Sequence, residues 1–152
     1  MMHVALFEPE IPQNTGNIVR TCNATGAVLH LIEPLGFAID NKKLKRAGLD
    51  CWHDMDIRYH KDFDTFLENV PGRTWFFSSY ATKPYHEITY REGDCLVFGK
   101  ETTGFPVWMR EKYAAQFLRQ PMLPGARCLN VSNSVAIALY EALRQQDFHG
   151  LG

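Results

Sequence analysis

Short apolar runs alternate with amphipathic segments along this chain of 152 residues. The runs are typical of buried strands, and apolar residues three or four positions apart predict helices between them. The predicted strands are residues 3–7, 27–32, 56–60, 73–79, 94–98 and 116–119. The predicted helices are residues 14–25, 41–48, 63–70 and 107–114, with a last helix that extends to residue 145. This alternation indicates one α/β domain over residues 1–152, with a mainly parallel sheet covered by helices on both faces.

Some element boundaries are marked by residues that start or stop helices. Asn14 or Thr15 is expected to cap the first helix, and Gly26 to end it. Its expected inner face consists of Ile18, Val19 and Cys22. Residues 83–92 carry a weaker pattern and are predicted to be a loop with a short extended piece at 87–90.

The stretch from residue 127 to residue 145 joins a polar loop directly to a helix that is apolar on more than one side. Val135, Leu139 and Leu143 recur at every fourth position, and Ile137 and Tyr140 widen the apolar surface. Such a helix needs cover on several faces, so we expect it to pack within its own domain or against a second subunit.

Four small polar residues stand just ahead of this helix: Asn130, Ser132, Asn133 and Ser134. Side-chain oxygens at such positions cap the first turn of a helix. An ordinary capped core helix explains part of the pattern. Because four such residues in five positions exceed what one cap needs, a ligand-binding loop is the better interpretation.

Polar loops follow three of the predicted strands, at residues 78–82, 99–106 and 121–125. In open parallel sheets, ligands bind beyond the carboxyl ends of the strands. The loops therefore predict one site at one edge of the sheet.

The middle loop is bracketed by Gly99 and Gly104, and glycine lets the backbone approach a ligand closely. The spacing resembles a phosphate-binding loop, but Phe105 and Pro106 stand where lysine and serine or threonine are required. A P-loop and the dinucleotide-binding glycine pattern are therefore both excluded. Either a tight strand–helix turn or a slot for a small flat ligand remains consistent with the pattern.

The composition describes an ordinary globular protein, with 45% hydrophobic and 22% charged residues. The net charge of −1 argues against a nucleic-acid partner unless positive charge is local. One local cluster exists, formed by Lys42, Lys43, Lys45 and Arg46. It fits a solvated helix face as well as an RNA contact.

No apolar run approaches the 18 residues or so that span a membrane, and the first residues lack the basic segment of a signal peptide. We therefore expect a cytoplasmic protein. Its four cysteines are widely spaced, which favours reduced thiols over a disulfide framework, and no histidine or cysteine pattern predicts a metal site. A nucleophile in Cys51-Trp52-His53 is disfavoured because adjacent residues rarely face each other.

Three motifs, taken together, resemble those of the SPOUT RNA methyltransferases. They are N-T-G-N-I-V-R at 14–20, F-G-K-E-T-T-G-F-P at 98–106 and R-C-L-N-V-S-N-S-V-A-I-A-L-Y-E at 127–141. The segments E-P-E-I-P-Q-N-T-G-N at 8–17 and I-E-P-L-G-F at 32–37 narrow the resemblance to the TrmL (YibK-type) group. The similarity extends over nearly the whole chain.

The resemblance implies an α/β fold with a C-terminal trefoil knot, which no pattern rule would predict. It also implies a homodimer that binds S-adenosylmethionine and releases S-adenosylhomocysteine. The implied reaction methylates the ribose 2′-hydroxyl of the wobble nucleotide, position 34, in the anticodon stem-loop of tRNA. In the TrmL group, the substrates are leucine tRNA isoacceptors. The alternatives are a methyltransferase of this family that acts on another RNA, and a non-catalytic dimer that binds S-adenosylmethionine and RNA.

The chemistry of the methyl donor agrees with this assignment. A sulfonium donor needs alignment and no metal. Together with the motif resemblance, this predicts cofactor contacts from Ser79, Tyr80, Ala81, Phe98, Gly99, Gly104, Met122, Leu123, Leu129, Asn130, Ser132 and Ser134.

The candidate catalytic residues match positions of the same motifs. Arg20 is expected to hold the phosphate beside the reacting ribose and to stabilise the developing oxyanion, because a guanidinium stays protonated and is a poor base. An arginine paired with a surface carboxylate is the alternative. Asn14 is expected to position Arg20, bind ribose or cap a helix, and Glu101 to orient Arg20 across a dimer interface or cap the following turn. Ser132 and Asn133 are expected near the methyl donor.

Overall fold

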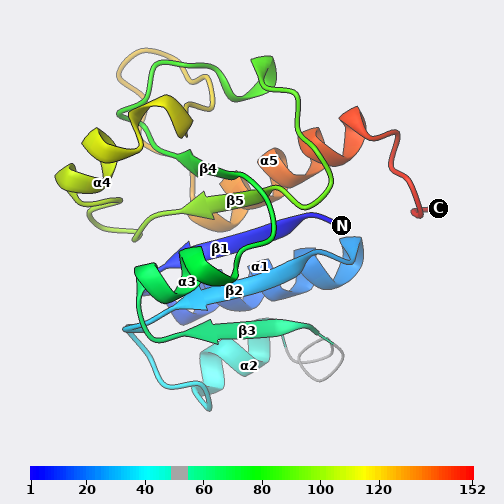
Figure 1. Ribbon diagram of the computed structural model, residues 1–152. Helices are drawn as coiled ribbons and strands as arrows, with labels where there is room; N and C mark the ends of the chain where they lie inside the picture. The colour runs from blue at the N-terminus through cyan, green and yellow to red at the C-terminus, as the bar shows by residue number, and fades with distance from the viewer. Residues whose placement is uncertain (49–54) are drawn as a thin grey trace.

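A parallel sheet forms the centre of the protein. The computed structural model describes residues 1–48 and 55–152, and within these residues six strands pair in the order β3-β2-β1-β5-β4-β6 (Figure 1). The strands are β1 (His3–Phe7), β2 (Val28–Ile32), β3 (Ile57–His60), β4 (Thr74–Phe77), β5 (Cys95–Phe98) and β6 (Phe117–Leu118). Every pairing between them is parallel, as the alternation of strands and helices predicted.

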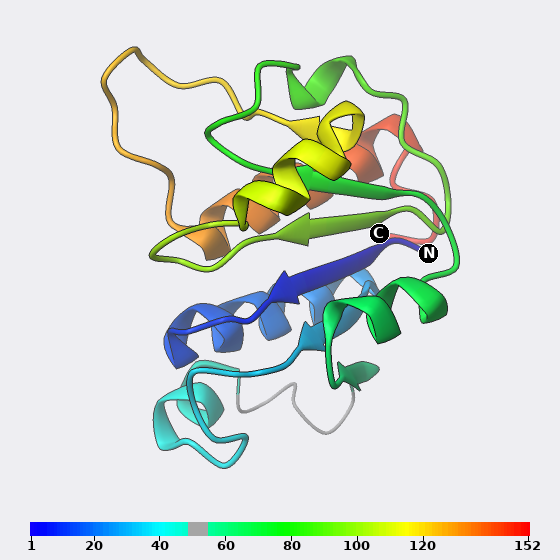
Figure 2. The ribbon, with the colours of Figure 1, turned by 60° about the vertical axis from the view of Figure 1, so that its left-hand side comes forward.

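Helices cover both faces of this sheet. They are α1 (Pro12–Thr25), α2 (Lys42–Gly48), α3 (Phe63–Asn69), α4 (Val107–Lys112) and α5 (Val131–Gln145), with short 3-10 turns at η2 (Tyr85–Glu87) and η3 (Ala114–Gln116). Helices α1 and α5 pack side by side on one face, and α3 and α4 lie on the other (Figure 2). Helix α2 packs against α1.

The two apolar cores follow from the alternation of side chains along each strand. On β1, Val4 and Leu6 join the core beneath α1 and α5, whereas Ala5 and Phe7 join the core beneath α3. The predicted inner face of α1 is confirmed, because Ile18, Val19 and Cys22 are fully buried. Gly26 ends that helix in the left-handed conformation, with φ of 74°. Glycine adopts this conformation without strain.

Two predicted helix starts were wrong. Helix α1 begins at Pro12, so Asn14 and Thr15 lie inside its first turn and cap nothing. Proline suits the first helical position because it needs no N–H partner there. Helix α5 begins at Val131, so Ser132, Asn133 and Ser134 lie inside its first turn instead of ahead of it.

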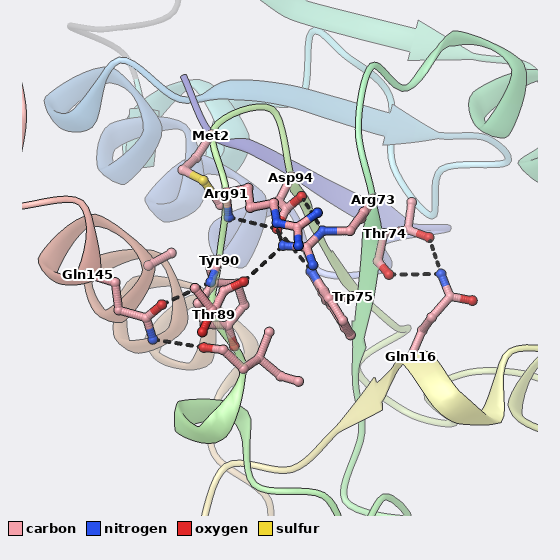
Figure 3. Close-up of polar contacts among 12 residues, drawn as sticks. Met2, Arg73, Thr74, Trp75, Thr89, Tyr90, Arg91, Asp94, Gln116 and Gln145 are labelled. Atoms are coloured by element: carbon pink, nitrogen blue, oxygen red, sulfur yellow. Dashed lines mark hydrogen bonds and ion pairs between the residues drawn. The ribbon is translucent and has the colours of Figure 1, made fainter.

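The extended piece predicted at residues 87–90 is confirmed only in part: a 3-10 turn covers Tyr85–Glu87, Ile88 after it is extended, and no strand forms among the described residues there. The side chain of Gln145 explains the difference. It accepts a hydrogen bond from the Tyr90 amide at 2.9 Å and donates one to the Ile88 carbonyl at 3.0 Å (Figure 3). These backbone groups are satisfied by a helix side chain, so no neighbouring strand is needed.

A network centred on Asp94 closes the edge of the sheet where β4 and β5 begin (Figure 3). Its carboxylate accepts two hydrogen bonds from the guanidinium of Arg73, at 3.0 and 2.6 Å, and one from the Trp75 indole at 3.1 Å. The Arg91 amide donates a further bond at 2.9 Å. Burial acts to raise the pKa of Asp94, but these donors outweigh it and hold the pKa below its ordinary value.

Three buried histidines cross neighbouring strands β1, β2 and β3. Nδ1 of His3 lies 2.8 Å from Nε2 of His30, and Nδ1 of His30 lies 2.9 Å from Nε2 of His60. The ring of Phe66 packs edge-on against His30 and His60. Burial, assisted by the charge of nearby Arg58, lowers the pKa of all three, that of His30 to about 3.

Candidate functional site

A pocket of about 690 Å³ opens at the carboxyl edge of the sheet. The loops that follow β1, β4, β5 and β6 line it together with the starts of α1 and α5. Both α1 and α5 begin at this edge, in blue and orange in Figure 2. The prediction that the three polar loops share one edge is therefore confirmed, although only part of each loop faces the pocket. A cavity of this size suits a nucleoside-sized ligand.

The loop after β5 closes on itself through its backbone. The Lys100 and Gly104 amides each donate to the other residue's carbonyl, at 3.2 and 2.9 Å. Gly104 has φ of 66°, and a Cβ added at Gly99 would stand 2.7 Å from the carbonyl carbon of Gly104. Both glycines are thus required by the tight turn, and their backbone forms a wall of the pocket.

Glu101 joins this loop to the start of α1. Its carboxylate accepts hydrogen bonds from the amides of Glu10 at 3.0 Å and Ile11 at 2.5 Å. Amides at this end of a helix have no partner within it, and the helix dipole favours a negative charge there. Glu101 therefore caps α1 from 90 residues away, and the prediction that it caps the following turn was wrong.

Asn14 connects the other two motifs. Its Nδ2 donates to Glu101 at 3.4 Å, and its Oδ1 accepts from Nδ2 of Asn130 at 3.0 Å. Asn14 is 8% exposed and forms no hydrogen bond with Arg20 in the described structure, so its positioning of Arg20 stays a prediction. Its role is to link the motif that starts α1 to those of the β5 loop and α5.

Asn130 caps α5 as the pattern predicted. Its Oδ1 accepts from the amides of Ser132 at 2.9 Å and Asn133 at 3.4 Å, and from the Ser132 hydroxyl. Ser134 exchanges two hydrogen bonds with the side chain of Gln120, one from its hydroxyl and one, at 2.8 Å, to its carbonyl. These contacts fasten the long loop between β6 and α5 to the first turn of the helix.

Two further contacts hold the loops after β1 and β5 together. Lys100 forms an ion pair with Glu8 at 3.0 Å. The amide and hydroxyl of Thr102 donate to Glu10 at 3.1 and 2.6 Å. The hydrogen bonds from Thr102 lower the pKa of Glu10, so the Glu10 carboxylate stays ionised at neutral pH and keeps accepting them.

The structure brings most of the predicted site residues together. Of the predicted cofactor contacts, those that line the pocket are Ser79, Tyr80, Phe98, Gly99, Gly104, Met122, Leu129, Asn130 and Ser134. Ala81, Leu123 and Ser132 do not line it, and Leu123 is 81% exposed.

Of the predicted catalytic residues, Asn14 and Glu101 line the pocket, whereas Arg20, Ser132 and Asn133 do not. Arg20 is exposed on α1. It forms no ion pair with any carboxylate of residues 1–48 and 55–152, which removes the alternative of a paired surface arginine within the described chain.

Several lining residues were not predicted. They are Ile11, Phe77, Ser78, Lys100, Thr102, Thr103, Gln120, Cys128 and Val131. Most sit next to a predicted residue in the sequence, so their position in the same loops was the only available signal. Gln120 lies outside the three motifs, and its hydrogen bond with Ser134 depends on how the chain folds.

The described residues hold no cluster of three or more histidine, cysteine or acidic side chains arranged to bind a metal ion. Among them, Cys22 and Cys95 are buried thiols and Cys128 is an exposed one. The disfavoured nucleophile at Cys51-Trp52-His53 lies outside the described residues. No helix in the described chain is long and apolar enough to cross a membrane.

Comparison with known proteins identifies the family to which this site belongs. Residues 1–140 match the SpoU rRNA methylase family, and the chain is therefore a member of that family. It is 49% identical over 152 residues to a tRNA (cytidine(34)-2′-O)-methyltransferase of Saccharophagus degradans, with 99% of each chain covered.

Solved structures agree. A structure that describes the 2-OH methylation of C/U34 on tRNA superposes with a TM-score of 0.92 and 45% identity, over 97% of each chain. The AdoMet-bound rRNA methyltransferase of Sinorhizobium meliloti superposes with a TM-score of 0.83 and 25% identity, over 99% of this chain and 57% of that one. The resemblance inferred from the three motifs is thus confirmed.

Proposed function

We propose that this protein transfers a methyl group from S-adenosylmethionine to the ribose 2′-hydroxyl of the wobble nucleotide of tRNA. The acceptor is cytidine or a modified uridine at position 34 in the anticodon stem-loop, in leucine isoacceptors. The main support is that the three motifs surround one pocket in a chain whose full-length relative carries that activity in its name. Position 34 lies in a single-stranded loop, where bases and riboses are open to recognition.

The pocket has the features that this cofactor requires. Phe98, Met122 and Leu129 add apolar side chains to its lining, and the backbone of Gly99 adds amide and carbonyl groups. Asn130 adds a polar side chain at one end. When bound there, S-adenosylmethionine supplies an activated methyl group on a sulfonium. The protein's contribution is then to align this group with the acceptor oxygen and to exclude water.

Arg20 is the candidate for handling the acceptor. Its guanidinium holds the phosphate beside the reacting ribose and stabilises the negative charge that develops on the oxygen. Arg20 lies about 9 Å along the helix axis from Asn14, outside the pocket of its own chain. We therefore place it at the pocket of a second subunit, with the protein acting as a homodimer.

The surface of α5 supports the homodimer. Ile137 and Tyr140 are 42% and 44% exposed on this helix, which packs beside α1. An interface that buries them would also bring Arg20 close to a neighbouring chain. Sedimentation at micromolar concentration should show a dimer, and a folded monomer under these conditions would contradict the proposal.

The first turn of α5 completes the proposed site. Ser132 is partly buried and Asn133 exposed, so both are available to a substrate that approaches this turn. The proposal also includes a trefoil knot, formed where the long loop after β6 leads into α5, and a cytoplasmic location, where tRNA is modified.

The test is transfer of labelled methyl from S-adenosylmethionine to total tRNA, followed by mapping of the labelled nucleotide. A 2′-O-methyl group at position 34 is the expected result. If the protein binds S-adenosylhomocysteine stoichiometrically but leaves all tRNA unlabelled, a non-catalytic binding dimer or another RNA substrate replaces this proposal.

A further inference from the structure

The loop after β4 carries an exposed aromatic ring to the mouth of the pocket. Tyr80 lines the pocket and yet is 71% exposed. The guanidinium carbon of Arg110, on α4, lies 4.0 Å from the centroid of its ring. This contact covers one face of the ring, and the high exposure of Tyr80 shows that much of its remaining surface is open to solvent.

Hydrogen bonds fix the backbone that carries this ring. The Tyr80 amide donates to the Ser78 hydroxyl at 3.1 Å, and the Ala81 amide donates to the Ser78 carbonyl at 3.2 Å. The guanidinium of Arg119 donates to the Ser79 carbonyl. The backbone of the loop is therefore ordered and Arg110 stacks on the ring, which lowers the entropy cost of using the ring to bind a ligand.

Two positive charges adjoin this loop: Arg110 is stacked on the ring, and Arg119 is bonded to Ser79. Neither Arg110 nor Arg119 forms an ion pair with a carboxylate of the described chain, whereas Lys100, inside the pocket, is paired with Glu8. The Nε of Arg110 is buried and has no hydrogen-bond acceptor within the described residues. An anionic group that approached this arginine would meet a guanidinium that no carboxylate of the described residues neutralises.

An aromatic ring stacked on an arginine suits a nucleotide. Bases of single-stranded nucleic acid stack on aromatic side chains, and a neighbouring guanidinium binds phosphate. Other lining residues, including Phe98, Gly99 and Leu129, remain available to the cofactor. Because Tyr80 lines the pocket and is largely exposed, its ring is accessible to an RNA that approaches the pocket from solvent.

We propose that Tyr80 and Arg110 form a stacking platform for a base next to the methylated nucleotide of the RNA substrate. Tyr80, expected from the sequence to contact the cofactor, is thereby assigned to RNA recognition. This inference rests on the proposed methyl transfer to RNA. The platform holds the flanking base while the target ribose enters the pocket.

The test compares methyl transfer to an anticodon stem-loop RNA by wild-type protein, Tyr80→Ala and Tyr80→Phe. Tyr80→Ala should raise the KM for RNA roughly 5- to 100-fold, since one base stacked on an aromatic ring contributes about 1–3 kcal/mol. Tyr80→Phe keeps the ring and should stay within about threefold of wild type. Affinity for S-adenosylhomocysteine, measured by calorimetry, should not change in either variant.

A second comparison identifies the base and the charge. An abasic nucleotide beside position 34 should weaken binding by the wild type but should weaken binding by Tyr80→Ala no further. Arg110→Gln should also raise the KM for RNA. Lys112→Gln, which removes a positive charge from the same helix, is the matched control and should leave the KM within about twofold.

The outcomes separate this inference from the function on which it rests. A wild-type protein that methylates no RNA defeats the proposed function itself. If the wild type is active and Tyr80→Ala leaves the KM for RNA unchanged, only the platform is refuted. If Tyr80→Ala weakens S-adenosylhomocysteine instead, the ring belongs to the cofactor site and the inference is again overturned.

Discussion

The two edges of the sheet differ in how completely their polar groups are satisfied. At the amino edge, Asp94 is 1% exposed and its carboxylate accepts hydrogen bonds from Arg73, Trp75 and Arg91. At the carboxyl edge, Ser79, Tyr80 and all of residues 123–130 are exposed. The same fold thus carries a closed polar network at one end and open polar loops at the other.

From this difference we infer that the amino edge mainly stabilises the fold and that the carboxyl edge mainly binds ligands. A buried charge with every acceptor filled stabilises the fold and has nothing left to offer a ligand. Exposed loops contribute little to stability and keep donors and acceptors for binding. The carboxyl edge is nevertheless fastened where it meets α1 and α5, through Glu101, Asn14 and Asn130.

Asp94→Ala should cause the largest loss of stability. It leaves Arg73 and Trp75 without their acceptor, and loss of one partner of a buried ion pair costs about 3–5 kcal/mol. Because Arg73 is one-third exposed, we expect the lower part of this range. Denaturant unfolding measures the loss, and methyl transfer by the folded fraction should be unchanged.

The exposed pair of Asp56 and Arg58 provides the control for that experiment. Asp56→Asn should reduce the free energy of unfolding by less than about 1 kcal/mol. An equal loss from Asp56→Asn and Asp94→Ala would contradict the special role of the amino edge.

Arg20→Ala should have the opposite profile. Loss of a group that stabilises developing charge lowers kcat roughly 100-fold or more, and the free energy of unfolding should stay within about 0.5 kcal/mol because the side chain is exposed. Arg20→Lys should retain part of the activity, since lysine keeps the charge but loses the bidentate contact. Arg91→Ala, at the amino edge, is the control and should leave kcat unchanged. Wild-type kcat in Arg20→Ala would contradict the assignment.

Acid should lower the free energy of unfolding through the three buried histidines on β1, β2 and β3. Burial lowers the pKa of His30 to about 3, whereas a histidine in the unfolded chain titrates near 6.5. Between these values the unfolded state binds more protons, so stability is complete above about pH 6.5 and falls as the pH decreases. The slope is at most about 1.4 kcal/mol per pH unit for each histidine.

The measurement is the midpoint of urea unfolding between pH 7 and pH 4.5. His30→Gln should flatten this dependence, whereas His149→Gln, at an exposed position, should preserve it. A wild-type midpoint that stays constant over this range would refute the account. The stabilisation by Asp94 is present at neutral pH and is lost only at more acid pH, because its pKa in the folded protein lies below its ordinary value.

Glu101→Ala should reduce stability by much less than Asp94→Ala. It removes a helix cap, which costs about 1 kcal/mol, from the carboxyl edge. Glu111→Ala, an exposed glutamate on α4, is the control and should cost less than about 0.5 kcal/mol. Thermal unfolding measures both. If Glu101→Ala and Glu111→Ala cost the same, the carboxylate does not cap α1.

The sequence predicted the sheet well because local patterns determine it. Buried runs such as residues 3–7 and 94–98 contain apolar residues on both faces, and only a strand covered on both faces buries them all. Loop positions at the carboxyl edge followed from the direction of parallel strands. Gly99 and Gly104 marked a tight turn, and the backbone conformation confirms it.

Contacts between distant segments could not be predicted in this way. Glu101 caps a helix 90 residues earlier in the chain, and His3, His30 and His60 are separated by 27 and 30 residues. The stacking of Arg110 on Tyr80 is of the same kind. Each depends on how strands and helices pack, which no local pattern specifies.

The central claim is that the three motifs form a cofactor pocket at the carboxyl edge of the sheet. A crystal structure of the protein with S-adenosylhomocysteine tests it most directly. We expect the nucleoside between Gly99 and Leu129, in contact with Phe98. Cofactor bound at any other place on the chain, with this pocket filled only by solvent, would contradict the account.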